Sequence, residues 1–192
     1  MKTVCLGDSL TFGYGVDPRE CWVSLAGQFY GGDWVNCGIC GDTALGMLAR
    51  LNTLIRPLQP RYVLIMGGYN DILITGSFQQ AQSAMMAMVH QCAHAGVRPV
   101  IGIPIPMRCA PGNSWRPLID MNRAIAVQAE YTKWLRLFVQ TLHLRSVDFA
   151  AAFEAHAFPD VLYQSDGLHP TAQGHLLMAK ALEESLIWRK ES

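Results

Sequence analysis

Three residues near the two ends of the chain carry side chains suited to nucleophilic chemistry. Ser9 follows a short apolar run, Val4–Leu6, that predicts a buried strand, and helix-compatible residues come after it. Asp166 and His169 are three residues apart across a glycine, so the carboxylate can reach the imidazole Nδ1. That contact holds the tautomer whose Nε2 accepts a proton from a serine hydroxyl. The spacing therefore predicts Ser9 as nucleophile, His169 as its base and Asp166 as the group that orients the base.

A serine at a strand-to-helix junction has a second common role, as the N-cap of the helix. The stretch Leu6–Gly13 alone does not separate the two roles. The block at the far end favours the nucleophile, because it supplies the base and its orienting carboxylate. Pro170 restricts His169 to an extended backbone and suits the start of a following helix.

Two middle segments offer hydrogen-bond donors for a developing oxyanion. Gly41 follows a second apolar run, and its N–H is not obstructed by a side chain. Asn70 follows a third apolar run and offers a carboxamide. With the N–H of Ser9, these groups would form three oxyanion donors at the ends of three successive strands. The neighbouring Asp42 and Asp71 are expected to stabilise loops rather than to transfer protons.

The four blocks taken together resemble the SGNH hydrolases, the family of GDSL esterases and lipases. Gly-Asp-Ser-Leu, Gly-Asp-Thr, Gly-Tyr-Asn-Asp and Asp-x-x-His-Pro occur in this order, and the resemblance spans residues 3–185. It implies Ser9 as nucleophile, His169 as base, Asp166 as its orienter, and Gly41 and Asn70 in the oxyanion hole. The phrase Leu-x-Arg-Leu at Leu48–Leu51 is similar to small single-domain bacterial esterases with thioesterase and lysophospholipase activity.

The elements that must position these residues alternate along the chain. Strands are predicted at Val4–Leu6, Trp34–Cys37, Tyr62–Met66, Arg98–Ile105 and Leu144–Phe149. Helices are predicted at Glu20–Tyr30, Phe78–Ala95, Leu118–Leu142 and Ala172–Trp188. A further helix is predicted to follow Thr43, which would be its N-cap. This alternation predicts one domain over residues 1–192, folded as a three-layer α/β/α sandwich around a parallel sheet. The resemblance implies a flavodoxin-like strand order, 2-1-3-4-5.

The substrate pocket is predicted less directly than the reacting groups. Phe12, Tyr14, Tyr69, Trp115 and Leu168 are candidates to line an apolar acyl site, although each residue type is equally suited to packing. The loop Met107–Pro117 is the candidate to cover the substrate, with an ordinary surface loop as the alternative.

Composition excludes several other classes of protein. Fifteen basic and fifteen acidic residues are interspersed, so neither a nucleic acid nor an anionic membrane is an expected partner. No apolar run approaches the length of a membrane span. Met1-Lys2-Thr3 leads directly into the first predicted strand, from which we expect a cytoplasmic protein without a leader. The six cysteines are expected to be free thiols, and the chemistry requires no metal or organic cofactor.

These observations predict a serine hydrolase of carboxylic esters or thioesters with small or medium acyl groups, acting through an acyl-serine intermediate. The resemblance extends this to lipase, lysophospholipase or thioesterase activity. One alternative keeps the family but makes the substrate an O-acetylated carbohydrate. A more distant alternative is a non-catalytic, flavodoxin-like binding module. The sequence has neither a G-x-G-x-x-G motif nor a P-loop, which argues against this alternative. The oligomeric state stays open.

Overall fold

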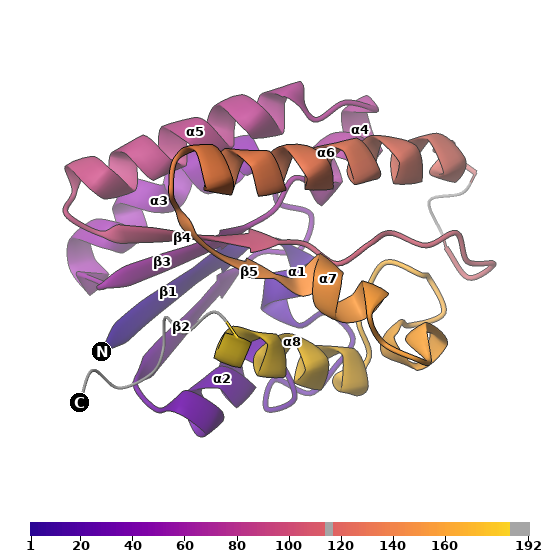
Figure 1. Ribbon diagram of the computed structural model, residues 1–192, viewed down its shortest axis with the longest axis horizontal. Coiled ribbons are helices and arrows are strands. Elements are labelled where there is room, and N and C mark those ends of the chain that lie inside the picture. The colour runs from indigo at the N-terminus through magenta and orange to yellow at the C-terminus, as the bar shows by residue number, and fades with distance from the viewer. Residues whose placement is uncertain (114–116, 185–192) are drawn as a thin grey trace.

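A central parallel sheet organises the computed structural model, which describes residues 1–113 and 117–184. Its five strands lie in the order β2-β1-β3-β4-β5 (Figure 1). They are β1 (Lys2–Gly7), β2 (Asp33–Gly38), β3 (Tyr62–Met66), β4 (Arg98–Ile103) and β5 (Arg145–Asp148). The predicted strand order and fold class are confirmed, and the predicted strands agree with the observed ones to within two residues at each end.

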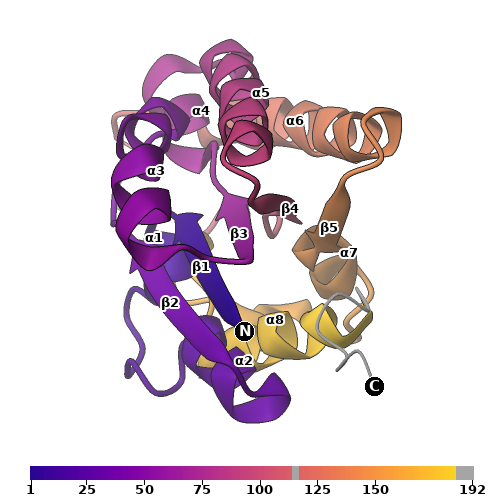
Figure 2. The same cartoon turned by 90° about the vertical axis from the view of Figure 1, so that its left-hand side faces the viewer.

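Helices cover both faces of this sheet and complete the three layers (Figures 1 and 2). One face carries α3 (Ala44–Leu58), α4 (Tyr69–Thr75), α5 (Gln79–His94) and α6 (Met121–Thr141). The other carries α1 (Ser9–Phe12), α2 (Trp22–Tyr30), α7 (Phe149–Glu154) and α8 (Ala172–Glu184), with a short 3-10 helix at Pro159–Leu162. None of the helices within the described ranges combines the length and the apolar character needed to cross a membrane.

The central strands are buried on both faces, which explains why their sequences are almost continuously apolar. Val4, Cys5 and Leu6 of β1 are fully buried, as is every residue of β3 from Val63 to Met66. Parallel strands between two helical layers have no solvent face, so alternation of apolar and polar residues is not expected. Apolar stripes of the covering helices, such as Ala81, Met85, Met88 and Cys92 of α5, close the core.

The register of the sheet brings the ends of three strands level with one another. Gly7, the last residue of β1, pairs with Gly38 at the end of β2 and with Met66 at the end of β3. The segments that follow these strands therefore leave from one edge of the sheet. Ligands of open α/β sheets bind at this edge, outside the carboxyl ends of the strands.

Some helices differ from the sequence-based expectation. The helix predicted from Leu118 begins at Met121, because the side chain of Asp120 accepts a hydrogen bond from the N–H of Arg123 and caps it there. Neither α4 nor α7 was predicted, since each is about two turns long or less and too short for a clear helical period. Thr43 caps α3 as predicted, accepting from the N–H of Gly46.

Candidate active site

Ser9 lies at the first turn after β1, where the chain enters α1. The N-cap of α1 is Asp8, whose carboxylate accepts a hydrogen bond of 2.9 Å from the N–H of Leu10. Ser9 is therefore the first residue of the helix and not its cap, so the capping role considered for it from sequence is wrong. Its hydroxyl is left free for another partner, and it lies 2.9 Å from Nε2 of His169.

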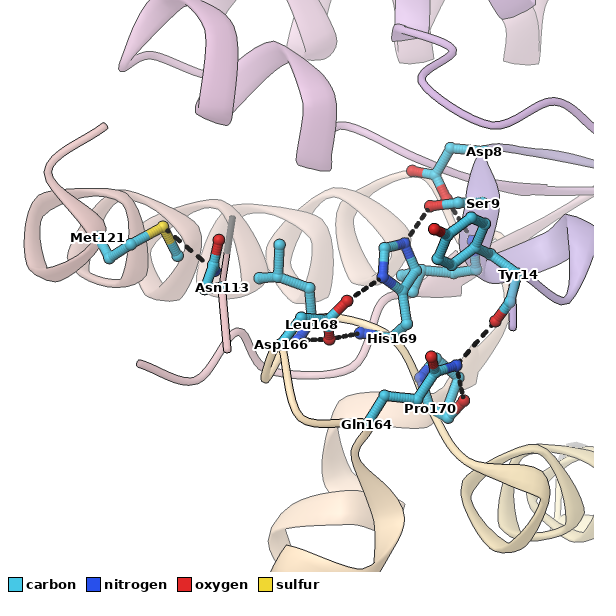
Figure 3. Close-up of polar contacts among 11 residues, drawn as sticks. Asp8, Ser9, Tyr14, Asn113, Met121, Gln164, Asp166, Leu168, His169 and Pro170 are labelled. Carbon is cyan, nitrogen blue, oxygen red and sulfur yellow. Dashed lines mark hydrogen bonds and ion pairs between the residues drawn. The ribbon is translucent and has the colours of Figure 1, made fainter. Parts of the chain in front are cut away.

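His169 joins Ser9 to Asp166 in a chain of three side chains (Figure 3). The Nδ1 atom of His169 lies 2.6 Å from Oδ2 of Asp166. The other carboxylate oxygen of Asp166 accepts from the backbone N–H groups of Leu168 and His169, at 2.9 and 3.0 Å. Because the carboxylate accepts a hydrogen bond from the Nδ1–H group, the proton stays on Nδ1, and Nε2 presents its lone pair to the hydroxyl of Ser9.

The surroundings of Asp166 keep its carboxyl ionised. Burial acts to raise its pKa, but hydrogen bonds from the ring and N–H of His169 and from the N–H of Leu168 outweigh burial and lower the pKa to about 2. A carboxylate that accepts several hydrogen bonds in its charged form resists protonation. Asp166 is thus negative at neutral pH, and its charge faces Nδ1 of His169.

A tight loop holds Asp166 and His169 in this arrangement. Gln164 donates its N–H to the carbonyl of His169 at 2.8 Å, and Gly167 donates its N–H to the carbonyl of Gln164 at 3.0 Å. The side-chain amide of Gln164 donates to the carbonyls of Tyr14 and Pro170, at 2.8 and 2.9 Å (Figure 3). Gln164 therefore fastens the loop to the segment after α1. Sequence reasoning missed this residue, because its partner Tyr14 is 150 positions away.

The two other predicted oxyanion donors come from the loops after β2 and β3. Gly41 adopts a φ of +79°, which L residues with side chains rarely do, and lies exposed at the turn before α3. Asn70 is the second residue of α4, and its amide donates to the carbonyl of Asp42 at 2.8 Å. The loop before Gly41 is tied to β1 by the N–H of Ile39, which donates to the carbonyl of Gly7 at 3.0 Å. Gly41 thus lies in a loop fastened to the end of β1, and Asn70 is joined to that loop through the carbonyl of Asp42.

Two acidic residues next to these donors, Asp42 and Asp71, stabilise loops, and a third, Asp8, is buried next to Ser9. Asp42 pairs with Arg50, and Asp71 accepts the N–H of Ala44 at 2.9 Å. These contacts confirm the loop-stabilising role expected of Asp42 and Asp71. Asp8 was not singled out from the sequence, where its burial could not be seen. Only 1% of Asp8 is exposed, and burial raises its pKa to about 7.

The predicted pocket residues fall into two groups. Tyr14 and Phe12 are about half exposed, and the ring of Tyr14 lies 4.6 Å from the ring of His169, centroid to centroid. Tyr69 and Leu168 are instead buried, at 4% and 3% exposure, and the hydroxyl of Tyr69 donates to the carbonyl of Ile105. Trp115 lies outside the described residues. A lining role for any of these residues stays a prediction.

The loop predicted to cover the substrate runs beside the turn that carries Asp166. The N–H of Arg108 donates to the carbonyl of Gly167 at 2.9 Å. A hollow of about 310 Å³ lies between the two segments, lined by residues that include Arg108, Cys109, Gln164 and Ser165. Within the described part of the chain, no three His, Cys, Asp or Glu side chains are grouped closely enough to hold a metal ion.

Known proteins share this sequence pattern and fold. The profile of the GDSL-like Lipase/Acylhydrolase family matches residues 5–177. The protein "Thioesterase 1/protease 1/lysophospholipase L1" of Escherichia coli (strain K12) is 34% identical over 98 residues, which are 50% of this chain and 47% of that protein. "Esterase TesA" of Pseudomonas aeruginosa is 33% identical over 112 residues, which are 55% of this chain and 56% of that protein. The chain thus spans about half the length of the curated relatives that it matches.

A solved structure extends the likeness over nearly the whole fold. A member of the lipolytic protein G-D-S-L family from Veillonella parvula superposes with a TM-score of 0.81 at 23% identity, over 96% of this chain and 97% of that one. At this identity the superposition establishes the fold alone.

Proposed function

We propose that this chain, which belongs to the GDSL-like lipase/acylhydrolase family, hydrolyses carboxylic esters or thioesters through an acyl-serine intermediate. The observation that carries the proposal is the hydrogen-bonded series from Ser9 through His169 to an ionised Asp166. A serine hydroxyl is a weak nucleophile until a base takes its proton, and this series provides that base in the required tautomer.

The reaction proceeds in two acyl transfers. The hydroxyl oxygen of Ser9 attacks the carbonyl carbon while Nε2 of His169 takes the hydroxyl proton. The negative charge on the former carbonyl oxygen is stabilised by the N–H groups of Ser9 and Gly41 and by the amide of Asn70. His169 then gives its proton to the departing alcohol or thiol, leaving an acyl-serine. In the second step His169 takes a proton from water, whose oxygen attacks the acyl carbon. The bond from that carbon to Oγ of Ser9 then breaks, His169 returns the proton to Oγ, and the acid is released.

The substrate class is supported by the relatives and by the rim of the site. The names of the matched relatives are those of an esterase and of a combined thioesterase, protease and lysophospholipase, and two of these three activities and the esterase act on acyl esters or thioesters. Phe12 and Tyr14 expose apolar rings on the segment that follows Ser9, and Tyr14 contacts His169 directly. Apolar surface beside the nucleophile favours an apolar acyl group, for which we propose small to medium length. We further propose action in the cytoplasm on a small-molecule substrate, without cofactor, nucleic acid or stable membrane insertion.

The test is hydrolysis of p-nitrophenyl esters from acetyl to palmitoyl by the wild type, Ser9→Ala and Ser83→Ala. Ser83 lies exposed on α5, so its variant controls for the loss of a serine hydroxyl. We expect activity that is highest at small or medium acyl groups, unchanged in Ser83→Ala and absent in Ser9→Ala. Activity confined to acetyl esters and to acetylated sugars would instead indicate a carbohydrate O-acetyl esterase. Equal activity in Ser9→Ala and wild type would overturn the acyl-serine mechanism. No activity in either protein would overturn the proposal and favour a binding module.

A further inference from the structure

We propose that Arg50 is a positioning residue for the oxyanion donors, and that it acts through Asp42 and the end of β1. The inference rests on the proposed function, because it concerns how the donors of that reaction are held. Arg50 is on α3 and belongs to neither the nucleophile, the base nor the donor set.

Arg50 holds two separate segments with one guanidinium group. Its Nε donates to Oδ2 of Asp42 at 2.8 Å, and its Nη2 donates to the carbonyl of Gly7 at 3.0 Å. The side chains of Arg50 and Asp42 are only 19% and 11% exposed, so water competes weakly for these bonds. Since the guanidinium is planar and rigid, the two bonds fix the separation between Asp42 and the end of β1.

All three proposed donors lie next to the groups that Arg50 holds. Gly7 comes two residues before Ser9, and Gly41 comes directly before Asp42. The amide of Asn70 donates to the backbone carbonyl of Asp42 at 2.8 Å. The positions of the three donors relative to one another therefore depend on the Arg50–Asp42 pair and its bond to Gly7.

The first turn of α3 leaves space for the Asp42 carboxylate. A Cβ atom at Gly46 would lie 1.9 Å from Oδ1 of Asp42. Gly46 has an ordinary helical backbone and not a positive φ, so space for the carboxylate, rather than backbone conformation, requires glycine here. An alanine at this position would displace the carboxylate without removing any charged or hydrogen-bonding side chain.

Oxyanion donors accelerate a reaction only when they are already in place as charge develops. A misplacement of about 1 Å in a catalytic arrangement can cost about 10²-fold in rate. Loss of the Arg50 bonds removes no donor but releases the loop that carries Gly41. We therefore expect kcat to fall about 10- to 100-fold with KM changed less than about threefold, because the donors act on the transition state rather than on substrate binding.

The experiment compares Arg50→Met, Arg50→Lys and Gly46→Ala with the wild type in ester hydrolysis. Arg136→Met is the matched control, since Arg136 also binds two partners, Asp148 and Glu154. These partners lie at β5 and α7, and β5 is separated from β1 in the sheet by β3 and β4. Inhibition by an alkylboronic acid is measured in parallel, because its serine adduct is a tetrahedral anion that needs the same donors. Inhibition by a neutral fatty alcohol reports ground-state binding only.

We expect Arg50→Met and Gly46→Ala to lower kcat and to weaken boronate inhibition by similar factors, while inhibition by the alcohol is unchanged. Arg50→Lys should recover part of kcat by keeping the charge beside Asp42, and Arg136→Met should retain the wild-type kcat. If Arg50→Met fails to fold, Gly46→Ala and Arg50→Lys decide the matter, since both keep a cation at residue 50. Wild-type kcat and boronate affinity in the folded variants would overturn the inference. Failure of the proposed function is a different result, because there the wild type itself would be inactive.

Discussion

Replacing Asp8 by asparagine is expected to stabilise the protein at alkaline pH but not at acid pH. Asp8 is buried beside Ser9, with one oxygen bonded to the N–H of Leu10, while Oδ2 has no hydrogen-bond partner among the described residues. Burial raises its pKa to about 7, and the charges of Asp42 and Asp71 add to this against the opposing effects of Leu10 and His169. Asparagine keeps an oxygen for Leu10 but cannot ionise.

The size of the effect follows from the two pKa values. The pKa of the Asp8 carboxyl is 3.8 in the unfolded chain and about 7 in the folded one. Between these values the folded protein binds a proton that the unfolded chain has released, so the free energy of unfolding falls as pH rises through this window. Three pKa units correspond to about 4 kcal/mol at about 1.4 kcal/mol per unit. At pH 8 the free energy of unfolding of the wild type is lower by this amount than at acid pH, whereas that of Asp8→Asn lacks this decrease.

The assay is urea unfolding followed by circular dichroism at pH 4 and pH 8. His175 titrates in an overlapping window with the opposite sign, since burial lowers its pKa to about 4. Its stabilising effect is lost as pH falls from about 6.5 towards 4, but it is present in both proteins and cancels in their difference. Asp33→Asn, which removes an exposed carboxylate, should change stability by less than about 0.5 kcal/mol at either pH. A difference between Asp8→Asn and wild type that is equal at the two pH values would refute the reasoning.

Three further predictions concern single groups. Asp166→Asn loses the charge that holds the Nδ1 proton of His169, so kcat should fall about 10⁴-fold in steady-state ester hydrolysis; a fall below tenfold would exclude this role. Asn70→Ala removes one proposed oxyanion donor and should lower kcat about 10²- to 10³-fold with little change in KM; an unchanged kcat would remove Asn70 from the mechanism. Gly68→Ala forces a side chain into a φ of +105° and to 2.5 Å from the ring of Tyr131, so urea unfolding should show a loss of about 2–4 kcal/mol; wild-type stability would contradict this strain.

The meeting of Ser9, Asp166 and His169 could be predicted from sequence because each residue lies in a short local motif. Asp166 and His169 share one turn, and Ser9 follows directly on a strand whose apolar character is plain. Parallel strands end at one edge of a sheet, so motifs placed after successive strands come together without any knowledge of distant contacts. The level register of Gly7, Gly38 and Met66 shows this principle at work.

The supporting groups could not be predicted, because their roles depend on partners far along the chain. Arg50 holds the carbonyl of Gly7, which is 43 positions away, and backbone carbonyls have no sequence signature. The hydroxyl of Tyr69 donates to the carbonyl of Ile105, 36 positions away, and that contact has no signature in the sequence. In the sequence Asp8 looks like an ordinary polar residue of a turn, because its burial arises only from tertiary packing.

The site combines one contact within a short turn, between Asp166 and His169, with one contact between distant parts of the chain, between His169 and Ser9. The contact between Asp166 and His169 spans three positions, whereas that between His169 and Ser9 spans 160. Partial opening of the molecule separates segments that are distant in the chain while leaving single turns intact. Gradual heating is therefore expected to separate Ser9 from His169 while the contact between His169 and Asp166 persists. We therefore expect mild heat to disrupt the assembly of the three side chains before it disrupts the local order of the Asp166–His169 turn.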